Sequence, residues 1–174
     1  KDRLEREEKE RREREEKERQ RLVEVRPLQE KITNRLNYAS VDCAAKVLEV
    51  NPEAADSSAI LTNNKDRYLL SPCTATKWAV IELCEEIGVE AFQISNQEHF
   101  SSTFETFEVY GLDYYSPSIV AELVNRSEDS PPPPDQKNHH HFLGRYRANN
   151  IRGGQYFPLK FSPSWTRYLL FRFV

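Results

Sequence analysis

Three short runs within residues 65–111 restrict the fold of this chain more than any other feature. They span residues 78–83, 89–95 and 106–110, and each is rich in β-branched or aromatic residues and bounded by turn residues. In the first run, Ile81 and Leu83 point to one face of a strand, and Trp78 and Val80 point to the other. A strand with apolar residues on both faces is buried on both sides, so the sequence predicts a mainly β fold with a sandwich core.

The second run alternates in the way that is typical of a half-buried strand. Phe92 and Ile94 point to one face, and Ala91 and Gln93 point to the other. Residues 44–50 form either the first strand or a short turn of helix. Further strands are expected at residues 59–61, 142–148, 155–159 and 168–174. The central stretch holds no nucleophile–base pair and no glycine-rich phosphate loop, so we expect no catalytic residues.

Residues 1–26 are almost wholly charged, with 11 basic and 10 acidic residues. Six glutamates precede a Lys or Arg by four positions, as Glu5 precedes Lys9. Each such pair stabilises an isolated helix by roughly 0.2–0.5 kcal/mol, so we expect a solvent-exposed α-helix. Leu4 is the only apolar residue before Leu22, so the heptad pattern of a coiled coil is absent. The helix is either a rigid stalk or a charged extension without a specific role.

Two further segments differ from the strand-rich region. Residues 27–36 begin with a proline that ends or kinks the charged helix, and they are expected to form a short amphipathic linker helix with Leu28, Ile32 and Leu36 on one face. Residues 113–141 contain four consecutive prolines and three adjacent histidines, a composition that favours extended geometry without packing. We expect a disordered insert there. Adjacent residues of an extended chain point in different directions, so the histidines are not expected to form a metal site.

Composition limits the compartment and the partners. The net charge of −3 argues against a general nucleic-acid binder. No apolar run approaches the roughly 20 residues of a membrane helix, so we expect any membrane anchor to lie outside these 174 residues. The three cysteines are either free thiols or partners in disulfides, which persist in an oxidising lumen. Asn125-Arg126-Ser127 is an N-glycosylation sequon, which agrees with a lumenal setting.

Several blocks of the sequence resemble the SUN domain. The resemblance is carried by NYASVDCAAKVLEVNPEAADSSAIL, NKDRYLLSPC, KWAVIELCEEIGVEAFQISNQEHFSSTFETFEVYG, LGRYRANNIRGGQYFPL and RYLLFRFV. It covers residues 37–174 except the insert, and it is similar to the divergent branch resident in the endoplasmic reticulum (ER), the mid-SUN or osteopotentia-like group. The resemblance implies a galactose-binding-like (jelly-roll) β-sandwich. SUN-like domains continue past the position of Val174 with another strand, so we expect the fold to be truncated at its C-terminal end.

The resemblance also implies which cysteines form disulfides. Cys73 matches a position that, in SUN domains generally, pairs with a cysteine near the end of the domain, here beyond Val174. Cys43 and Cys84 are similar to cysteines of the ER branch, and we expect them to bridge each other. Three buried free thiols are the alternative.

Two regions resemble the ligand-binding parts of KASH-binding SUN domains, with departures. Those domains clamp a peptide under a long hairpin lid, whereas only ten residues separate Val50 from Leu61 here, and a histidine of their peptide pocket aligns with Asn96. The loop similar to residues 62–73 holds a monovalent cation in that group, largely through backbone carbonyls. The candidate residues for such a cation here are Asn63, Asn64 and Asp66.

The resemblance implies a non-catalytic lumenal module, without a cofactor, of a membrane-anchored ER protein that binds a protein partner, itself expected to be a membrane protein. The ER branch is linked to membrane-protein complexes and to the folding and quality control of new proteins. Because the coiled coil that usually precedes SUN domains is absent, the oligomeric state stays open.

Two other functions remain open, a nuclear-envelope tether for KASH peptides and a glycan-binding sandwich. Exposed aromatic residues on the loops would favour the glycan function, and the candidates are Tyr114, Tyr115 and Phe100. Partner-binding residues are expected in the loops at the ends of the sandwich. These loops are residues 62–73 and 96–103, and the candidates in the second are Asn96, Gln97, His99, Phe100 and Ser101.

Overall fold

The computed structural model describes residues 9, 11–12, 35–97, 103–127, 139–159 and 164–174. It divides into two units, Lys1–Leu36 and Asn37–Val174. In the first unit Lys9, Arg11 and Arg12 are helical and exposed, in line with the predicted charged helix. The rest of that helix, and all of the linker helix except Arg35 and Leu36, lie outside the described residues.

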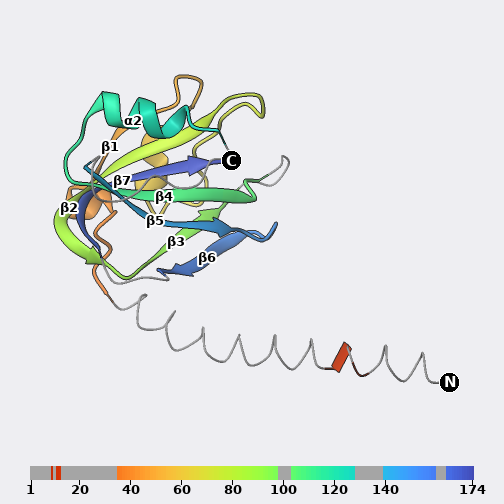
Figure 1. The fold of residues 1–174 in the computed structure, drawn as a ribbon. Helices are drawn as coiled ribbons and strands as arrows, with labels where there is room; N and C mark the ends of the chain where they lie inside the picture. The colour runs from red at the N-terminus through yellow and green to blue at the C-terminus, as the bar shows by residue number, and fades with distance from the viewer. Residues whose placement is uncertain (1–8, 10, 13–34, 98–102, 128–138, 160–163) are drawn as a thin grey trace. The chain divides into compact units, whose positions relative to one another are not determined.

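The second unit is a sandwich of two antiparallel sheets (Figure 1). Its elements are η1 (Val41–Cys43), β1 (Lys46–Val50), η2 (Ser57–Leu61), β2 (Lys77–Val89), β3 (Ala91–Asn96), β4 (Thr106–Leu112), α2 (Pro117–Val124), β5 (His140–Arg147), β6 (Gly153–Pro158) and β7 (Ser164–Phe173). The larger sheet has the order β1-β2-β7-β4-β5, and the smaller one pairs β3 with β6. The predicted β-sandwich is confirmed.

An aromatic core lies between the two sheets. Phe92 of the small sheet packs edge-on against Tyr146 and Phe171 of the large sheet, with ring centroids 5.1 Å and 5.5 Å apart, and stacks on Phe157 at 5.6 Å. Gln93, its neighbour in β3, is exposed. The predicted alternation in this strand is therefore confirmed, and its apolar side faces the core.

The long strand β2 is buried on both faces, as its sequence predicts. Ile81 and Leu83 join the core between the sheets, whereas Val80 joins a second core on the other face of the large sheet. A register irregularity between Glu82 and Ile87 lets β2 continue to Val89 along its neighbour β7.

The second core contradicts the prediction that all of residues 113–141 form a disordered insert. Helix α2 lies over the large sheet on the side away from β3 and β6 (Figure 1), and it buries Ile119, Val120, Leu123 and Val124. The proline-rich composition hid two local signals. Pro117 suits a first helical position, where no backbone donor is needed, and the apolar residues that follow share one helix face. The four prolines themselves lie outside the described residues.

Two smaller predictions were wrong. Residues 59–61 were expected to be a strand, but they belong to the 3-10 helix η2, which follows a left-handed residue, Asp56, at φ 56°. His140 was placed in the insert, but it is the first residue of β5, pairs with Leu112 and is only 1% exposed. In both places tertiary packing decides the conformation that a short segment adopts.

Candidate functional site

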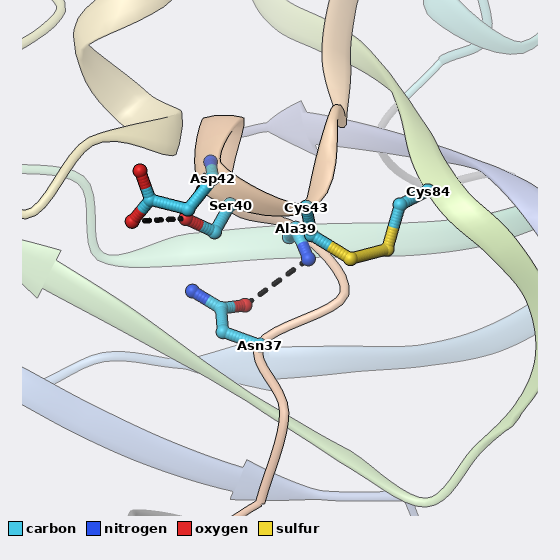
Figure 2. Close-up of a disulfide and its surroundings, with 6 residues drawn as sticks. All are labelled: Asn37, Ala39, Ser40, Asp42, Cys43 and Cys84. Carbon is cyan, nitrogen blue, oxygen red and sulfur yellow. Dashed lines mark hydrogen bonds between the residues drawn. A yellow bond between two sulfur atoms is a disulfide. The ribbon is translucent and has the colours of Figure 1, made fainter.

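The disulfide between Cys43 and Cys84 ties the start of the domain to its longest strand (Figure 2). The two Cα atoms are 5.6 Å apart and the residues are separated by 41 positions. A backbone hydrogen bond of 3.1 Å from the Cys84 amide to the Tyr38 carbonyl runs beside the bridge. This is the pairing that the resemblance implied.

The chain around Cys43 is shaped by short polar contacts. The Ser40 side chain caps η1 by accepting a hydrogen bond of 3.2 Å from the Asp42 amide. Asn37 Oδ1 accepts one of 3.1 Å from the Ala39 amide (Figure 2). Ala44 then takes a left-handed conformation with φ 72°. These turns bring Cys43 back over β2, next to Cys84.

Residues 51–77, which we call the loop unit, run from the end of β1 to the first residue of β2, and hydrogen bonds within the segment hold it in shape. The buried Asn51 accepts a 3.2 Å hydrogen bond from the Ser71 hydroxyl and donates one of 3.0 Å to Glu53. Ala55 and Leu70 exchange two backbone hydrogen bonds, of 2.8 Å and 3.1 Å. The loop unit therefore has a defined shape although it lacks a regular strand.

Charged contacts close the loop unit further. The Arg67 guanidinium pairs with both carboxylate oxygens of Asp56, and its Nε lies 3.0 Å from Oδ2. The Lys77 ammonium donates to the carbonyl oxygens of Cys73 and Ala75, at 3.0 Å and 2.9 Å. These two backbone carbonyls therefore contact the positively charged ammonium group of Lys77.

The candidate cation residues form a turn. Asn64 Oδ1 accepts a 2.9 Å hydrogen bond from the Asp66 amide, and Asn63, Asn64 and Asp66 are all exposed. Across the part of the chain that the structure describes, no three His, Cys, Asp or Glu residues are grouped to hold a metal ion. Cation binding through backbone carbonyls stays a prediction.

Two apolar side chains of the loop unit point to solvent. Ile60 is 37% exposed and Leu70 is 46% exposed, although both belong to segments fixed by the hydrogen bonds above. Loops on a rigid scaffold commonly carry binding function. The loop unit is therefore the candidate protein-binding surface.

The second predicted binding loop, residues 96–103, is described only at its ends. Asn96 Nδ2 donates a 3.5 Å hydrogen bond to the Ile151 carbonyl, and Gln97 is half-buried. His99, Phe100 and Ser101 lie outside the described residues. Their role in partner binding stays a prediction.

A buried ionic network beneath α2 was missed by sequence reasoning. Glu108, 3% exposed, accepts hydrogen bonds from Arg172 at 2.9 Å, from Arg145 at 2.6 Å and 3.0 Å, and from the Tyr110 hydroxyl at 2.9 Å. Burial by itself would raise the pKa of Glu108, but these donors outweigh burial and hold the pKa below its usual value. Burial and the Glu108 charge raise the pKa of Tyr110 to about 12.

The network also fastens the C-terminal end of α2. Arg172 donates to the Arg126 carbonyl, and Arg126 Nη1 donates to the Tyr110 hydroxyl at 3.3 Å. A glutamate within an apolar strand is usually exposed, and only the distant arginines of β5 and β7 make its burial favourable. No local signal in the sequence indicates it.

The histidines lie closer to an acidic residue than the sequence indicated. His141 Nε2 is 2.9 Å from Asp113 Oδ1, and His139 Nδ1 is 3.5 Å from Asp113 Oδ2. The antiparallel pairing of β4 with β5 brings the end of one strand to the start of the other, which sequence spacing does not reveal. The side chains that make these contacts are partly exposed.

The structure agrees with one of the three candidate exposed aromatic residues, differs at a second, and leaves Phe100 outside the described residues. Tyr114 is 47% exposed, whereas Tyr115 is half-buried and donates a 2.9 Å hydrogen bond to Glu49. Trp165, at the start of β7, is 68% exposed and was not among the predicted residues.

Within the described residues, no helix has the length and apolar character needed to span a membrane.

Comparisons with known proteins place these features in a family. The family model described as Sad1 / UNC-like C-terminal matches residues 50–131, which include β2, β3, β4 and α2. The protein slp1 of Schizosaccharomyces pombe is 40% identical over 141 residues, covering 80% of this chain and 19% of the relative. The SUN domain-containing ossification factor of Homo sapiens is 55% identical over 82 residues, covering 47% of this chain and 6% of the relative.

The fold itself has solved counterparts. The family 32 carbohydrate-binding module of Streptococcus pneumoniae EndoD superposes with a TM-score of 0.52 at 12% identity, covering 80% of this chain and 86% of the module. This likeness shows the galactose-binding-like sandwich and nothing about a ligand. The chain spans about a fifth or less of the length of the two relatives above. Their similarity, the family match and the sandwich fold together show that this chain belongs to the Sad1/UNC-like family of SUN domains.

Proposed function

We propose that the domain is a non-catalytic, lumenal protein-binding module of a membrane-anchored ER protein, and that it acts in membrane-protein complexes and in protein folding and quality control. SUN-domain proteins generally act through protein–protein interactions, and the family includes ER-associated and nuclear-envelope proteins. The Cys43–Cys84 disulfide is the observation that carries the lumenal part, because a cytosolic protein would keep both thiols reduced.

The loop unit is the surface proposed to contact the partner. It presents Ile60 and Leu70 to solvent on a segment that Asn51, Ser71 and the Ala55–Leu70 backbone pair hold in place. A pre-ordered surface loses little conformational entropy when it binds, so a few exposed apolar groups there stabilise a complex effectively. The partner is expected to offer a complementary apolar patch.

Two other functions have less support. A tether for KASH peptides would use a long hairpin lid, but residues 51–61 form a turn and the 3-10 helix η2. A glycan-binding function is favoured by the exposure of Trp165, because an exposed indole can stack on a sugar ring. Glycan-array binding by the domain, abolished by Trp165→Ala, would support the glycan function.

Site-specific photo-crosslinking in native membranes tests the proposal. A photoreactive amino acid replaces Leu70 or Ile60 in the full-length protein, and a matched variant carries it at Trp165. Trp165 lies at the start of β7, eight residues before Phe173, which pairs with Lys77 of the loop unit. An extended strand of that length spans about 26 Å. We expect one specific protein adduct from the loop unit and none from Trp165. Adducts at Trp165 alone, or at no position, would contradict the proposal.

A further inference from the structure

We infer that Asn125 carries an N-linked oligosaccharide, an inference that rests on the proposed lumenal location. Asn125-Arg126-Ser127 is the only Asn-x-Ser/Thr sequon in the chain. A sequence match of this length occurs often by chance, so the inference depends on where the structure places the three residues.

Asn125 directly follows α2 and its side chain is exposed. Asparagine is favoured at helix ends where the backbone turns left-handed, but here φ is −83° and ψ is 5°. Its backbone amide donates to the Ala121 carbonyl at 3.1 Å, a bond that any residue except proline can make. Among the described residues no partner bonds to its side-chain amide. The fold therefore does not require asparagine at this position.

The middle residue of the sequon turns inward and its neighbours turn outward. The Arg126 side chain donates to the buried Tyr110 hydroxyl at 3.3 Å, and its carbonyl accepts from Arg172. Asn125 and Ser127, the two residues that the glycosyl transfer requires, are both exposed. The buried network thus holds the sequon through Arg126, the residue whose side chain takes no part in glycosylation.

The reaction is a group transfer from a lipid-linked oligosaccharide diphosphate, the donor of the ER lumen. The amide nitrogen of Asn125 bonds to the anomeric carbon of the first sugar, the bond from that carbon to the diphosphate oxygen breaks, and the lipid diphosphate leaves while the nitrogen loses one proton to the enzyme's base. The folded structure accommodates the product, because the side chain of Asn125 points to solvent. The sugar would shield the C-terminal end of α2 from protein partners, so partner binding is expected elsewhere on the domain.

The test uses the full-length protein, purified without reductant from cells with a secretory pathway. Mass spectrometry reads the peptide containing Asn125 before and after treatment with peptide N-glycosidase, which converts a glycosylated asparagine to aspartate. We expect a glycan in the wild type and in Ser127→Thr, and its complete loss in Ser127→Ala. The Cys43–Cys84 link, read in the same digest, verifies that each variant has folded.

A reporter variant separates this inference from the proposed function. Ile151→Thr creates a sequon at Asn149, which is exposed in the turn between β5 and β6. Glycosylation of Asn149 in that variant with a bare Asn125 would overturn the inference and leave the lumenal location standing. Bare asparagines at both positions would overturn the lumenal location and the inference together.

Discussion

Removal of the Cys43–Cys84 disulfide is expected to lower the melting temperature of the domain by about 14 °C. The bridge closes a loop across 41 positions, for which the chain-entropy relation gives about 4 kcal/mol at 25 °C. The second unit has 174 − 36 = 138 residues. At about 2.1 cal/mol/K per residue its unfolding entropy is about 290 cal/mol/K, so 4 kcal/mol corresponds to about 14 °C.

The assay compares thermal unfolding, followed by circular dichroism, of the wild type and a Cys43→Ala/Cys84→Ala double variant. Cys73→Ala is the matched control, because Cys73 is exposed and forms no disulfide with any described residue, so within residues 37–174 its removal opens no loop and leaves no cavity. We expect the control to melt within about 2 °C of the wild type, since exposed substitutions usually change stability by less than 0.5 kcal/mol. Reductant is expected to bring the wild type close to the double variant.

The structure also indicates what loosens when the bridge is lost. Residues 37–45 are held to β2 by the bridge and by the hydrogen bond from the Cys84 amide to the Tyr38 carbonyl. Amide exchange in this segment should therefore rise more than in β4 or β7. A melting temperature within about 3 °C of the wild type, with the bridge verified in the wild type by peptide mapping, would refute the reasoning from loop entropy.

Three further predictions concern the two cores. Glu108→Gln is expected to lower the free energy of unfolding by about 3 kcal/mol, because it leaves the buried Arg172 without its carboxylate partner. Urea denaturation measures this loss. The folded pKa of Glu108 is lowered, so the stability that its carboxylate contributes is complete above the unfolded pKa of about 4.3. This contribution is lost as pH falls through the folded pKa. The difference in unfolding free energy between the wild type and Glu108→Gln should therefore shrink in acid. Leu123→Ala, at a fully buried position of α2, is expected to cost about 3 kcal/mol by the same assay. Gly144→Ala is expected to lower the melting temperature, because Gly144 has φ +143° and a Cβ there would lie 2.8 Å from the Tyr146 hydroxyl.

Each of these variants has a matched control, either close by in the chain or in a similar backbone conformation. Glu105→Gln removes an exposed ion pair with Arg147 and should cost well under 1 kcal/mol at every pH. Glu122→Ala is exposed on α2 and should leave stability within 0.5 kcal/mol. Gly153→Ala shares the positive φ but meets no atom within 4 Å, so it isolates backbone strain from the clash. Equal losses in a variant and its control would contradict the explanation for that pair.

The strands that the sequence predicted well are those whose own residues decide their burial. Ile81 and Val80 alternate between two apolar environments, and Phe92 alternates with the exposed Gln93, so the period of two is visible without any partner. The apolar residues at the C-terminal end likewise predicted β7. Their position between β2 and β4 could not be predicted, because strand order depends on contacts far apart in the chain.

The errors fall where composition and local structure disagree. A proline-rich segment indicated disorder, yet Ile119 and Leu123 form a helix face that the large sheet buries. Residues 59–61 were predicted to be a strand but form a 3-10 helix. The prediction failed because a run of three apolar residues is too short for its periodicity to distinguish a strand from a helix. The exposure of Ile60 and Leu70, which carries the proposed binding surface, depends on how the whole loop unit folds.

The amino-acid sequence by itself determined the fold class and the family, since strand periodicity and short similar blocks are local properties of the chain. It also carried the expectation of the Cys43–Cys84 bridge and contained the sequon at Asn125. Only the tertiary structure decided that Glu108 is buried between two arginines from other strands and that Asn125 faces outward while Arg126 faces inward. Burial and charge pairing join residues that are distant in sequence, and local propensity holds no information about which distant residues meet.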